Sequence, residues 1–294
     1  MKFIKLNYEK FNSIHFIDHL SRNKQQQIKK CMPKEKTFIN QLAQFLQLLY
    51  AENMKNESLF TKKQAPFIIG INGSVSSGKS YFADQLQKIL KCFNPNLKVD
   101  LLSTDNFIYS NKILESKKIF DKKGFTESYN WKLLLKTLDK IKKNKSVKTP
   151  YYSQSMSDIH PTKKLTLPSN LNILIIEGIN LLKPTCYNLS ENLCRKLLLS
   201  DYLDYSIYLE TSEKNLQKWF HTRLNRKKTL WKQKKIKKNL TRKNKAEFKT
   251  FTDNIWKKYN HPNLVKNIKP FRYRSDMIIH KKLDHKVDFI QLKI

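Results

Sequence analysis

The chain has 294 residues, 39% hydrophobic and 12% aromatic, and its 58 Lys and Arg against 24 Asp and Glu give a formal net charge of +34. This composition excludes a chain that is disordered throughout, and the length allows one large α/β domain as readily as two small ones. No hydrophobic run reaches the length of a membrane span, and the N-terminus lacks the hydrophobic segment and cleavage site of a secretory signal, so we expect a cytoplasmic protein with no membrane partner.

The first 64 residues are polar and predict helix, most clearly over Phe38–Tyr50, where hydrophobic residues recur at helical spacing. The next segment, Pro66–Ile71, is hydrophobic and predicts a buried strand. It is followed by Lys79–Cys92, which has the period of an amphipathic helix. A strand–loop–helix unit is therefore predicted to start near residue 66.

Strands and helices alternate along the rest of the chain. The hydrophobic pattern predicts strands at Val99–Ser103, Leu171–Ile176, Tyr205–Leu209, Met277–Ile279 and Val287–Leu292, and helices at Trp131–Ile141, Ser212–Leu224 and Ala246–Tyr259. The lysine-rich run Gln233–Lys245 has little hydrophobic content and predicts a mobile surface segment. This alternation predicts an α/β fold, with a mainly parallel sheet flanked by helices on both faces.

A complete phosphate-binding motif, G-x-x-x-x-G-K-[ST], lies between the first predicted strand and the helix after it. Its residues are Gly73, Ser74, Val75, Ser76, Ser77, Gly78, Lys79 and Ser80. In such a loop the backbone N–H groups surround the phosphates, the lysine reaches the β- and γ-phosphate oxygens, and the last hydroxyl is placed to bind Mg²⁺. A chance glycine turn beside a lysine is the alternative, and the flanking strand and helix argue against it. The motif predicts ATP binding by a fold of the P-loop nucleoside triphosphate hydrolase type.

Two acidic residues follow predicted strands. Asp105 comes shortly after Val99–Ser103, and Glu177 comes directly after Leu171–Ile176. Because ligands bind at the carboxyl ends of the strands in open α/β sheets, both carboxylates should face the phosphates. Phosphoryl transfer to a hydroxyl needs one group to accept the proton and another to hold Mg²⁺, and we assign Asp105 to the first role and Glu177 to the second. The alternative is that each acid is only a helix cap or a solvated turn residue.

Arg223 lies on the predicted helix Ser212–Leu224. A guanidinium group over the transferring phosphoryl group would stabilise its spread negative charge. In so basic a chain a surface arginine is the ordinary interpretation, so the local sequence alone leaves both roles open.

The net charge also has two interpretations. A basic surface raises the affinity of a protein for nucleic acid and other polyanions. The lysines, however, are spread from one end of the chain to the other, and only five glycines remain. This pattern favours compositional drift with solvated lysines over a selected nucleic-acid surface.

Several sequence blocks resemble type I (bacterial) pantothenate kinases, a family of P-loop kinases. The blocks are Phe67–Ser80, Ser103–Tyr109, Lys122–Tyr129, Ile175–Asn180, Ser200–Tyr208, Ile255–Asn260 with Pro262–Leu264, Pro270–Asp276 and Asp284–Val287. The P-loop is shared by many kinases, whereas the Lys-Gly-Phe-x-Glu-Ser-Tyr run within Lys122–Tyr129 separates this family from uridine kinases and phosphoribulokinases. The resemblance divides the chain into an N-terminal helical extension, residues 1–65, and a P-loop kinase domain, residues 66–294.

The resemblance implies phosphorylation of the 4'-hydroxyl of pantothenate with ATP and Mg²⁺, the first step toward coenzyme A. Members of the family are usually homodimers that coenzyme A inhibits. The site residues that the resemblance implies are Lys79 and Ser80 for ATP and Mg²⁺, Asp105 as the base, Arg223 at the γ-phosphate, Tyr152 and Asn260 at pantothenate, and His285 near the nucleotide base.

The chain departs from the family at several of these places. Gln154 stands where a histidine is usual beside pantothenate, and Ser157 where a tyrosine is usual. Phe220 replaces a tyrosine whose hydroxyl helps to hold the substrate. Tyr81 replaces a threonine after the loop, and Asp84 stands where an arginine usually contacts coenzyme A. We therefore expect a retained catalytic set, an altered acceptor wall and weakened inhibition by coenzyme A.

Three functions stay open from the sequence. The first is a pantothenate kinase, which Lys122–Tyr129 and Asn260 favour. The second is a related P-loop kinase, similar to uridine kinase, whose acceptor site has drifted, and Gln154, Ser157 and Phe220 argue for it. The third is a basic P-loop protein that binds nucleic acid, and only the net charge supports it, so we expect no specific nucleic-acid partner.

Overall fold

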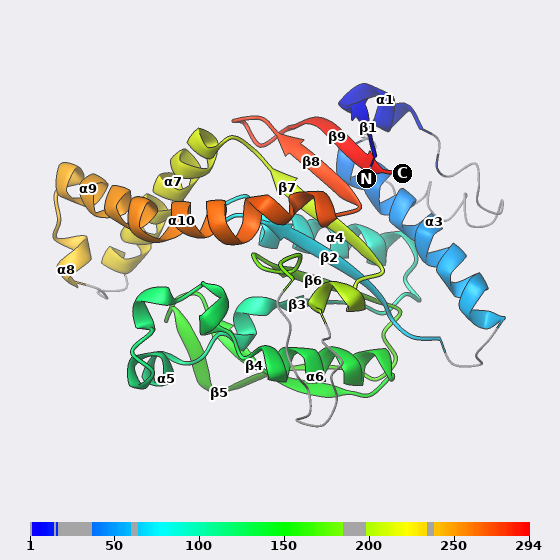
Figure 1. Cartoon of the computed structure of the whole chain (residues 1–294), viewed down its shortest axis with the longest axis horizontal. Coiled ribbons are helices and arrows are strands. Elements are labelled where there is room, and N and C mark those ends of the chain that lie inside the picture. The colour runs from blue at the N-terminus through cyan, green and yellow to red at the C-terminus, as the bar shows by residue number, and fades with distance from the viewer. Residues whose placement is uncertain (1, 15, 17–36, 60–63, 185–197, 234–237) are drawn as a thin grey trace.

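The computed structural model of the chain describes residues 2–14, 16, 37–59, 64–184, 198–233 and 238–294 (Figure 1). Among these residues, no helix is both long enough and hydrophobic enough to cross a membrane.

The core of the described chain is a seven-stranded sheet with the order β1-β9-β8-β7-β2-β6-β3. Its strands are β1 (Phe3–Asn7), β2 (Phe67–Gly73), β3 (Val99–Ser103), β6 (Ile173–Gly178), β7 (Tyr205–Glu210), β8 (Met277–Lys281) and β9 (Val287–Lys293). Neighbouring strands from β3 to β8 pair in parallel, whereas β9 and β1 pair antiparallel at one edge. The predicted α/β fold with a mainly parallel sheet is confirmed.

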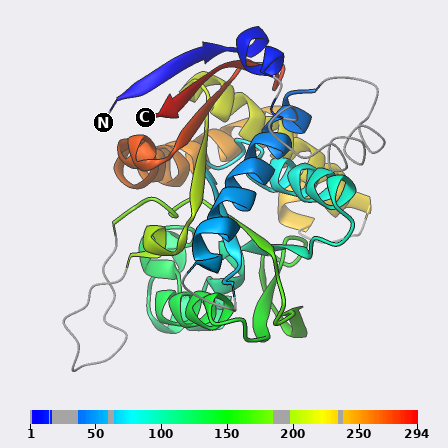
Figure 2. The same cartoon turned by 90° about the vertical axis from the view of Figure 1, so that its right-hand side faces the viewer.

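Helices cover both faces of this sheet, as Figures 1 and 2 show from two directions. The helices of the described residues are α1 (Tyr8–Ser13), α3 (Phe38–Ser58), α4 (Lys79–Phe93), α5 (Asn111–Ser116), α6 (Trp131–Lys142), α7 (Glu213–Gln233), α8 (Lys238–Thr241), α9 (Lys245–Ile255) and α10 (His261–Asn263), with π-helical turns at Trp256–Asn260 and Leu264–Ile268. Helices α3 and α4 pack on one face, and α6 and α7 pack on the other.

Side chains of β2, in the middle of the sheet, point alternately to its two faces and so enter two separate hydrophobic cores. Ile69 and Ile71 point into the core under α3 and α4, together with Leu86. Ile68 points to the opposite face and packs in the core with Leu134 of α6. Fully burying one such side chain stabilises the fold by about 1.5–3 kcal/mol. A strand that is buried on both faces is hydrophobic at most positions, which is why the parallel strands could be predicted from the sequence.

The helix prediction for the N-terminal 65 residues is wrong at Phe3–Asn7. These residues form β1, which pairs with β9 at the sheet edge, with Leu6 opposite Ile290. Leu6 is the buried residue of this strand, so no hydrophobic alternation marks it in the sequence. Helices α1 and α3 account for the rest of the described segment. The domain boundary at residue 65 stays a prediction.

The antiparallel hairpin of β4 (Val147–Ser153) and β5 (Asp158–Leu167), a separate two-stranded sheet, was not predicted from the sequence. Both strands carry a proline, Pro150 and Pro161, and half of the residues of β5 are exposed. Prolines and exposed polar residues interrupt the hydrophobic pattern that marks a strand of a sheet core. This hairpin matters for function, because the turn between its strands reaches the candidate active site.

The predicted mobile segment Gln233–Lys245 falls only partly within the described residues. Residues 234–237 lie outside them, and Lys238–Thr241 form α8. Helix α7 also runs beyond its predicted end at residue 224, as far as Gln233, over lysines and arginines that have good helix propensity.

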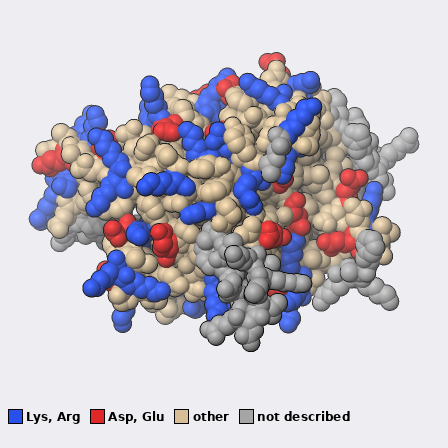
Figure 3. All heavy atoms as spheres, viewed as in Figure 1, with Lys and Arg blue, Asp and Glu red and all other residues tan. Residues whose placement is uncertain are grey.

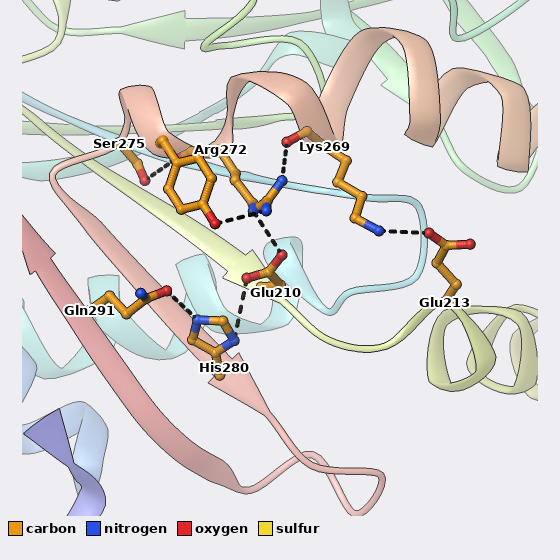
Figure 4. Close-up of polar contacts among 8 residues, drawn as sticks. Glu210, Glu213, Lys269, Arg272, Ser275, His280 and Gln291 are labelled. Atoms are coloured by element: carbon orange, nitrogen blue, oxygen red, sulfur yellow. Dashed lines mark hydrogen bonds and ion pairs between the residues drawn. The ribbon is translucent and has the colours of Figure 1, made fainter. Parts of the chain in front are cut away.

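A polar network anchors the start of α7 to the C-terminal strands (Figure 4). The Glu210 carboxylate, at the end of β7, lies 3.2 Å from Arg272 Nε and 3.3 Å from His280 Nδ1. Glu213, the first residue of α7, pairs with Lys269 Nζ at 2.8 Å. These ion pairs, at Glu210 before α7 and at Glu213 in its first turn, hold the start of the helix in place.

Candidate active site

The phosphate-binding loop follows β2 and ends at the N-terminus of α4. Gly73 and Gly78 have φ angles of 148° and 90°. A Cβ atom on Gly73 would lie 2.8 Å from the Leu209 carbonyl oxygen. Both positions therefore need glycine. The loop has the structural context that its motif predicted, with a helix N-terminus that favours an anion.

Lys79, the first residue of α4, is 8% exposed. Its ammonium group donates a hydrogen bond to the Ser74 carbonyl oxygen at 2.8 Å. Burial lowers the pKa of Lys79, and the carboxylates of Glu177 and Asp105 act in the opposite direction. The loop thus holds a buried cation between its own backbone and two carboxylates.

Glu177 lies in β6, between β2 and β3 in the sheet, and its carboxylate reaches the loop. Its Oε1 accepts hydrogen bonds from the Ser103 hydroxyl at 2.7 Å and the Ser80 hydroxyl at 3.2 Å. Hydroxyl and carboxylate oxygens are the ligand types that Mg²⁺ prefers. In the described part of the chain there is no group of three or more His, Cys, Asp and Glu side chains that could hold a metal without further ligands. The Glu177 carboxylate and the Ser80 hydroxyl nevertheless fit Mg²⁺, because this ion is commonly held by one or two carboxylates together with substrate phosphates.

Asp105 lies in a 3₁₀ turn, Thr104–Phe107, directly after β3. Burial and, to a smaller extent, the neighbouring Glu177 carboxylate raise the pKa of Asp105 to about 6, although Lys79, Arg223 and the hydrogen bond from Gln154 act in the opposite direction. A carboxyl group with a pKa near neutrality can hold a proton that it takes from a substrate and can release it again.

Arg223 comes from α7, and the side chain of Gln154 connects it to Asp105. The Arg223 Nη2 donates a hydrogen bond to Gln154 Oε1 at 3.3 Å, and Gln154 Nε2 donates to Asp105 Oδ2 at 3.4 Å. The structure therefore brings the predicted arginine close to the predicted base.

These side chains line one cleft of about 540 Å³. The predicted site residues in its lining are Val75, Ser76, Lys79, Ser80, Asp105, Tyr152, Glu177 and Arg223. Asn260 does not line it, because it lies in the π-helical turn Trp256–Asn260, where its Nδ2 is buried without a hydrogen-bond partner. His285 does not line it either.

His285 lines a second and larger cavity, of about 1530 Å³, which meets the phosphate-binding loop at Gly78. The imidazole ring stacks on Trp219 with 4.0 Å between ring centroids. Lys281 lines the same cavity, and its ammonium group donates a hydrogen bond to the Ser77 carbonyl oxygen at 3.0 Å. A flat aromatic surface thus adjoins the loop.

Sequence reasoning missed two polar residues at this site. Ser103 orients the Glu177 carboxylate, and Lys281 holds the loop backbone from β8. Ser103 stands two residues before Asp105 and could have been suspected from its place at a strand end. Nothing marked Lys281 among 58 basic residues.

Comparison with known proteins shows the family. The model of the Phosphoribulokinase / Uridine kinase family matches residues 68–288. A pantothenate kinase from Streptococcus pyogenes serotype M49 is 40% identical over 248 residues, covering 82% of this chain and 78% of the relative, and one from serotype M5 is 39% identical over the same shares. The chain belongs to the pantothenate kinases.

Among solved structures, D-glycerate 3-kinase from Cryptococcus neoformans has a TM-score of 0.62 at 14% identity, covering 85% of this chain and 97% of that one. The protein YGR205w has a TM-score of 0.59 at 19% identity, covering 88% and 100%. Both likenesses confirm the P-loop kinase fold.

The residues expected from the sequence to depart from the family pattern fall in different surroundings. Gln154 and Ser157 line the cleft. Phe220 is 7% exposed and packs on Trp256 in the core. Tyr81 is 73% exposed and lines the larger cavity. The departures thus divide into a changed cleft wall and changes that lie away from the reacting groups.

Asp84 lines neither cavity. Its carboxylate pairs with Lys88, one turn along α4, at 2.7 Å, and 43% of its side chain is exposed. The negative charge is therefore partly compensated and screened by solvent.

The basic residues do not gather in one patch on the face that Figure 3 draws. Lysine and arginine side chains are spread over that face, with acidic side chains between them. This distribution agrees with solvated lysines on the drawn face.

Proposed function

We propose that this pantothenate kinase transfers the γ-phosphoryl group of ATP to the 4'-hydroxyl of pantothenate, as the first step of coenzyme A biosynthesis. The observation that carries the proposal is one cleft in which the phosphate-binding lysine, a raised-pKa carboxylate and an arginine lie together. Phosphoryl transfer needs little more than positioning and charge stabilisation, and these three groups supply both.

Each side chain has a distinct part in this proposal. The loop backbone and Lys79 hold the β- and γ-phosphates, and Arg223 stabilises the charge that spreads over the transferring group. Asp105 accepts the proton of the acceptor hydroxyl as the new P–O bond forms and the bond to ADP breaks. Ser80 and Glu177 would hold Mg²⁺, which neutralises phosphate charge when it is bound.

Other residues bind the two substrates at a distance from the transferred group. Tyr152 lines the cleft beside Asp105 and is placed to contact pantothenate. His285, stacked on Trp219, provides a surface for the nucleotide base. Asn260 is assigned to pantothenate on the family pattern alone, because it does not line the cleft and its amide nitrogen is buried.

The second candidate is a kinase with a different small alcohol as acceptor, as in uridine kinases. It is favoured by Gln154 and Ser157, because both line the acceptor side of the cleft and both depart from the family. Its core chemistry would be the same.

An assay of ADP release tests the proposal directly. We expect release to depend on pantothenate and on Mg²⁺, with little stimulation by uridine or by DNA. Lys79→Ala protein serves as the control for contaminating kinases. Stimulation by uridine alone would support the second candidate, and turnover that depends on DNA would support a nucleic-acid partner.

We also propose that the chain works as a cytoplasmic homodimer whose inhibition by coenzyme A is weak. The family pattern supports the dimer, and Asp84 and Gln154 at positions that usually contact the inhibitor support the weak inhibition. Sedimentation of the purified chain tests the dimer, because a monomer at micromolar concentration would contradict it.

A further inference from the structure

The turn between β4 and β5, residues 154–157, crosses the cleft from the hairpin to α7. Gln154 is the first residue of this turn, directly after Ser153 at the end of β4. Its amide contacts Asp105 on one side and Arg223 on the other, at 3.4 and 3.3 Å. Asp105 belongs to the strand end, whereas Arg223 belongs to a helix about 120 residues later in the chain. One side chain thus connects two parts of the active site that come from separate elements.

The polarity of the amide matches both neighbours in one orientation only. The NH₂ group faces the carboxylate, which can only accept when it is ionised, and the carbonyl oxygen faces the guanidinium group, which can only donate. A flipped amide would place oxygen against oxygen and nitrogen against nitrogen. The two charged neighbours therefore fix the amide, and the amide in turn fixes them.

We propose that Gln154 is a positioning residue. Its amide lies between the Asp105 carboxylate and the Arg223 guanidinium group, keeps the two groups from pairing and holds each in a fixed orientation. This inference rests on the proposed function of the cleft. Both groups contact the same amide, so without it the Arg223 side chain could turn toward the Asp105 carboxylate and pair with it directly. Such a pair would occupy the oxygens that must accept the hydroxyl proton and the nitrogens that must face the phosphoryl group.

The Gln154 amide itself does not titrate, so a change of the bridge with pH comes from Asp105, whose pKa is about 6. Asp105 is faced by Lys79 from α4, Glu177 from β6, Arg223 from α7 and, more distantly, the hydroxyls of Tyr129 and Tyr152. Burial and the nearby carboxylates raise the pKa of both tyrosines, so these hydroxyls stay protonated around neutrality. A bridging side chain that changed its charge would disturb this arrangement, whereas glutamine leaves it unchanged.

Two substitutions test the bridge. Gln154→Met keeps the length of the side chain but removes the amide that donates to Asp105 and accepts from Arg223. We expect kcat to fall about 10- to 100-fold, because displacing a catalytic group by about 1 Å can reduce the rate by this much. The KM for ATP should change by no more than about twofold, because ATP is held by the loop. Thr166→Ala, on the exposed face of β5 in the same hairpin, is the matched control and should leave kcat unchanged.

Gln154→His provides a readout that a purely structural role would not change. A neutral imidazole has one donor and one acceptor nitrogen, but the protonated ring has two donors, so it can no longer accept from Arg223. We expect the ratio of variant to wild-type kcat to lie within about threefold of one at pH 8 and to fall about tenfold or more by pH 5.5, since histidine titrates near pH 6.5.

Four measurements separate the outcomes. Thermal melting of each variant shows whether it is folded, and ATP binding by calorimetry shows whether the loop is intact. If the wild-type chain has no turnover with pantothenate, the proposed function is wrong. If the wild type is active but Gln154→Met matches it in kcat, or the Gln154→His ratio does not change with pH, the bridge has no positioning role.

Discussion

The two walls of the active-site cleft are built in different ways. The proposed nucleotide wall is one continuous segment, Gly73–Ser80, which would contact the phosphates mainly through backbone N–H groups at the start of α4. The acceptor wall is assembled from side chains of the 3₁₀ turn after β3, the β4–β5 turn and α7, which are far apart in the sequence. A backbone cradle changes little when the chain accumulates lysine and asparagine, provided that its glycines remain. A wall of side chains, in contrast, changes with each substitution. Gln154 and Ser157 both belong to the acceptor wall.

The largest expected effect lies on the nucleotide wall. Lys79→Ala removes the cation that faces the β- and γ-phosphates, and we expect kcat to fall at least about 10²-fold, as for other groups that stabilise transition-state charge. The loss should be the same with pantothenate or any other acceptor, which steady-state ADP release measures. Lys91→Ala, an exposed lysine on the same helix, is the control. Near-normal turnover of the Lys79 variant would contradict the assigned role of the loop.

A smaller effect is expected on stability at the acceptor wall. The pKa of Asp105 is about 6 in the folded chain and near 3.8 when unfolded, so folding favours the protonated form. Stability from this group therefore falls as pH rises from 3.8 to 6, and the full cost is present above pH 6. Asp105→Asn removes this cost, and we expect it to raise Tm by roughly 2–4 °C at pH 7.5, which corresponds to about 1 kcal/mol.

Thermal melts without nucleotide measure this difference. It should shrink as the pH is lowered toward 5, because the wild-type carboxyl group then becomes protonated. A Tm for Asp105→Asn that lies below the wild-type value at pH 7.5 would show that the carboxylate stabilises the fold.

The smallest expected effect concerns inhibition by coenzyme A, a strongly anionic ligand. Asp84→Arg should tighten inhibition about two- to fivefold at matched ATP, since exposed charges contribute about 0.3–1 kcal/mol. The KM for ATP should hardly change, because Asp84 lines neither cavity and pairs with Lys88. Asp84→Asn should lie between the two. Tight inhibition of the wild-type chain by coenzyme A, competitive with ATP, would show that other residues have replaced the missing arginine.

The contrast between the walls also explains what the sequence could predict. The loop, Asp105 and Glu177 follow buried parallel strands, whose hydrophobic runs are unmistakable, so both the strands and their carboxyl ends could be located. The resemblance to a family then placed Arg223 in the same cleft, and the structure agrees with that placement.

The features that sequence reasoning missed lack such a pattern. The β4–β5 hairpin is interrupted by prolines and half of β5 is exposed, and β1 has one buried residue. The contacts of Gln154 with Asp105 and of Lys281 with the loop join residues 49 and 204 positions apart, which no local pattern encodes. These contacts depend on the packing of α7 and β8 beside the central strands, and only the folded structure shows them.

The central claim is that Asp105 accepts the proton of the acceptor hydroxyl while the loop holds ATP independently. The most direct test measures ATP binding and pantothenate-dependent ADP release for Asp105→Asn. We predict an ATP dissociation constant within about threefold of wild type and a loss of turnover of about 10²- to 10⁴-fold, the range for a general base. Near-normal turnover would contradict the claim, as would a variant that had lost ATP binding along with its activity.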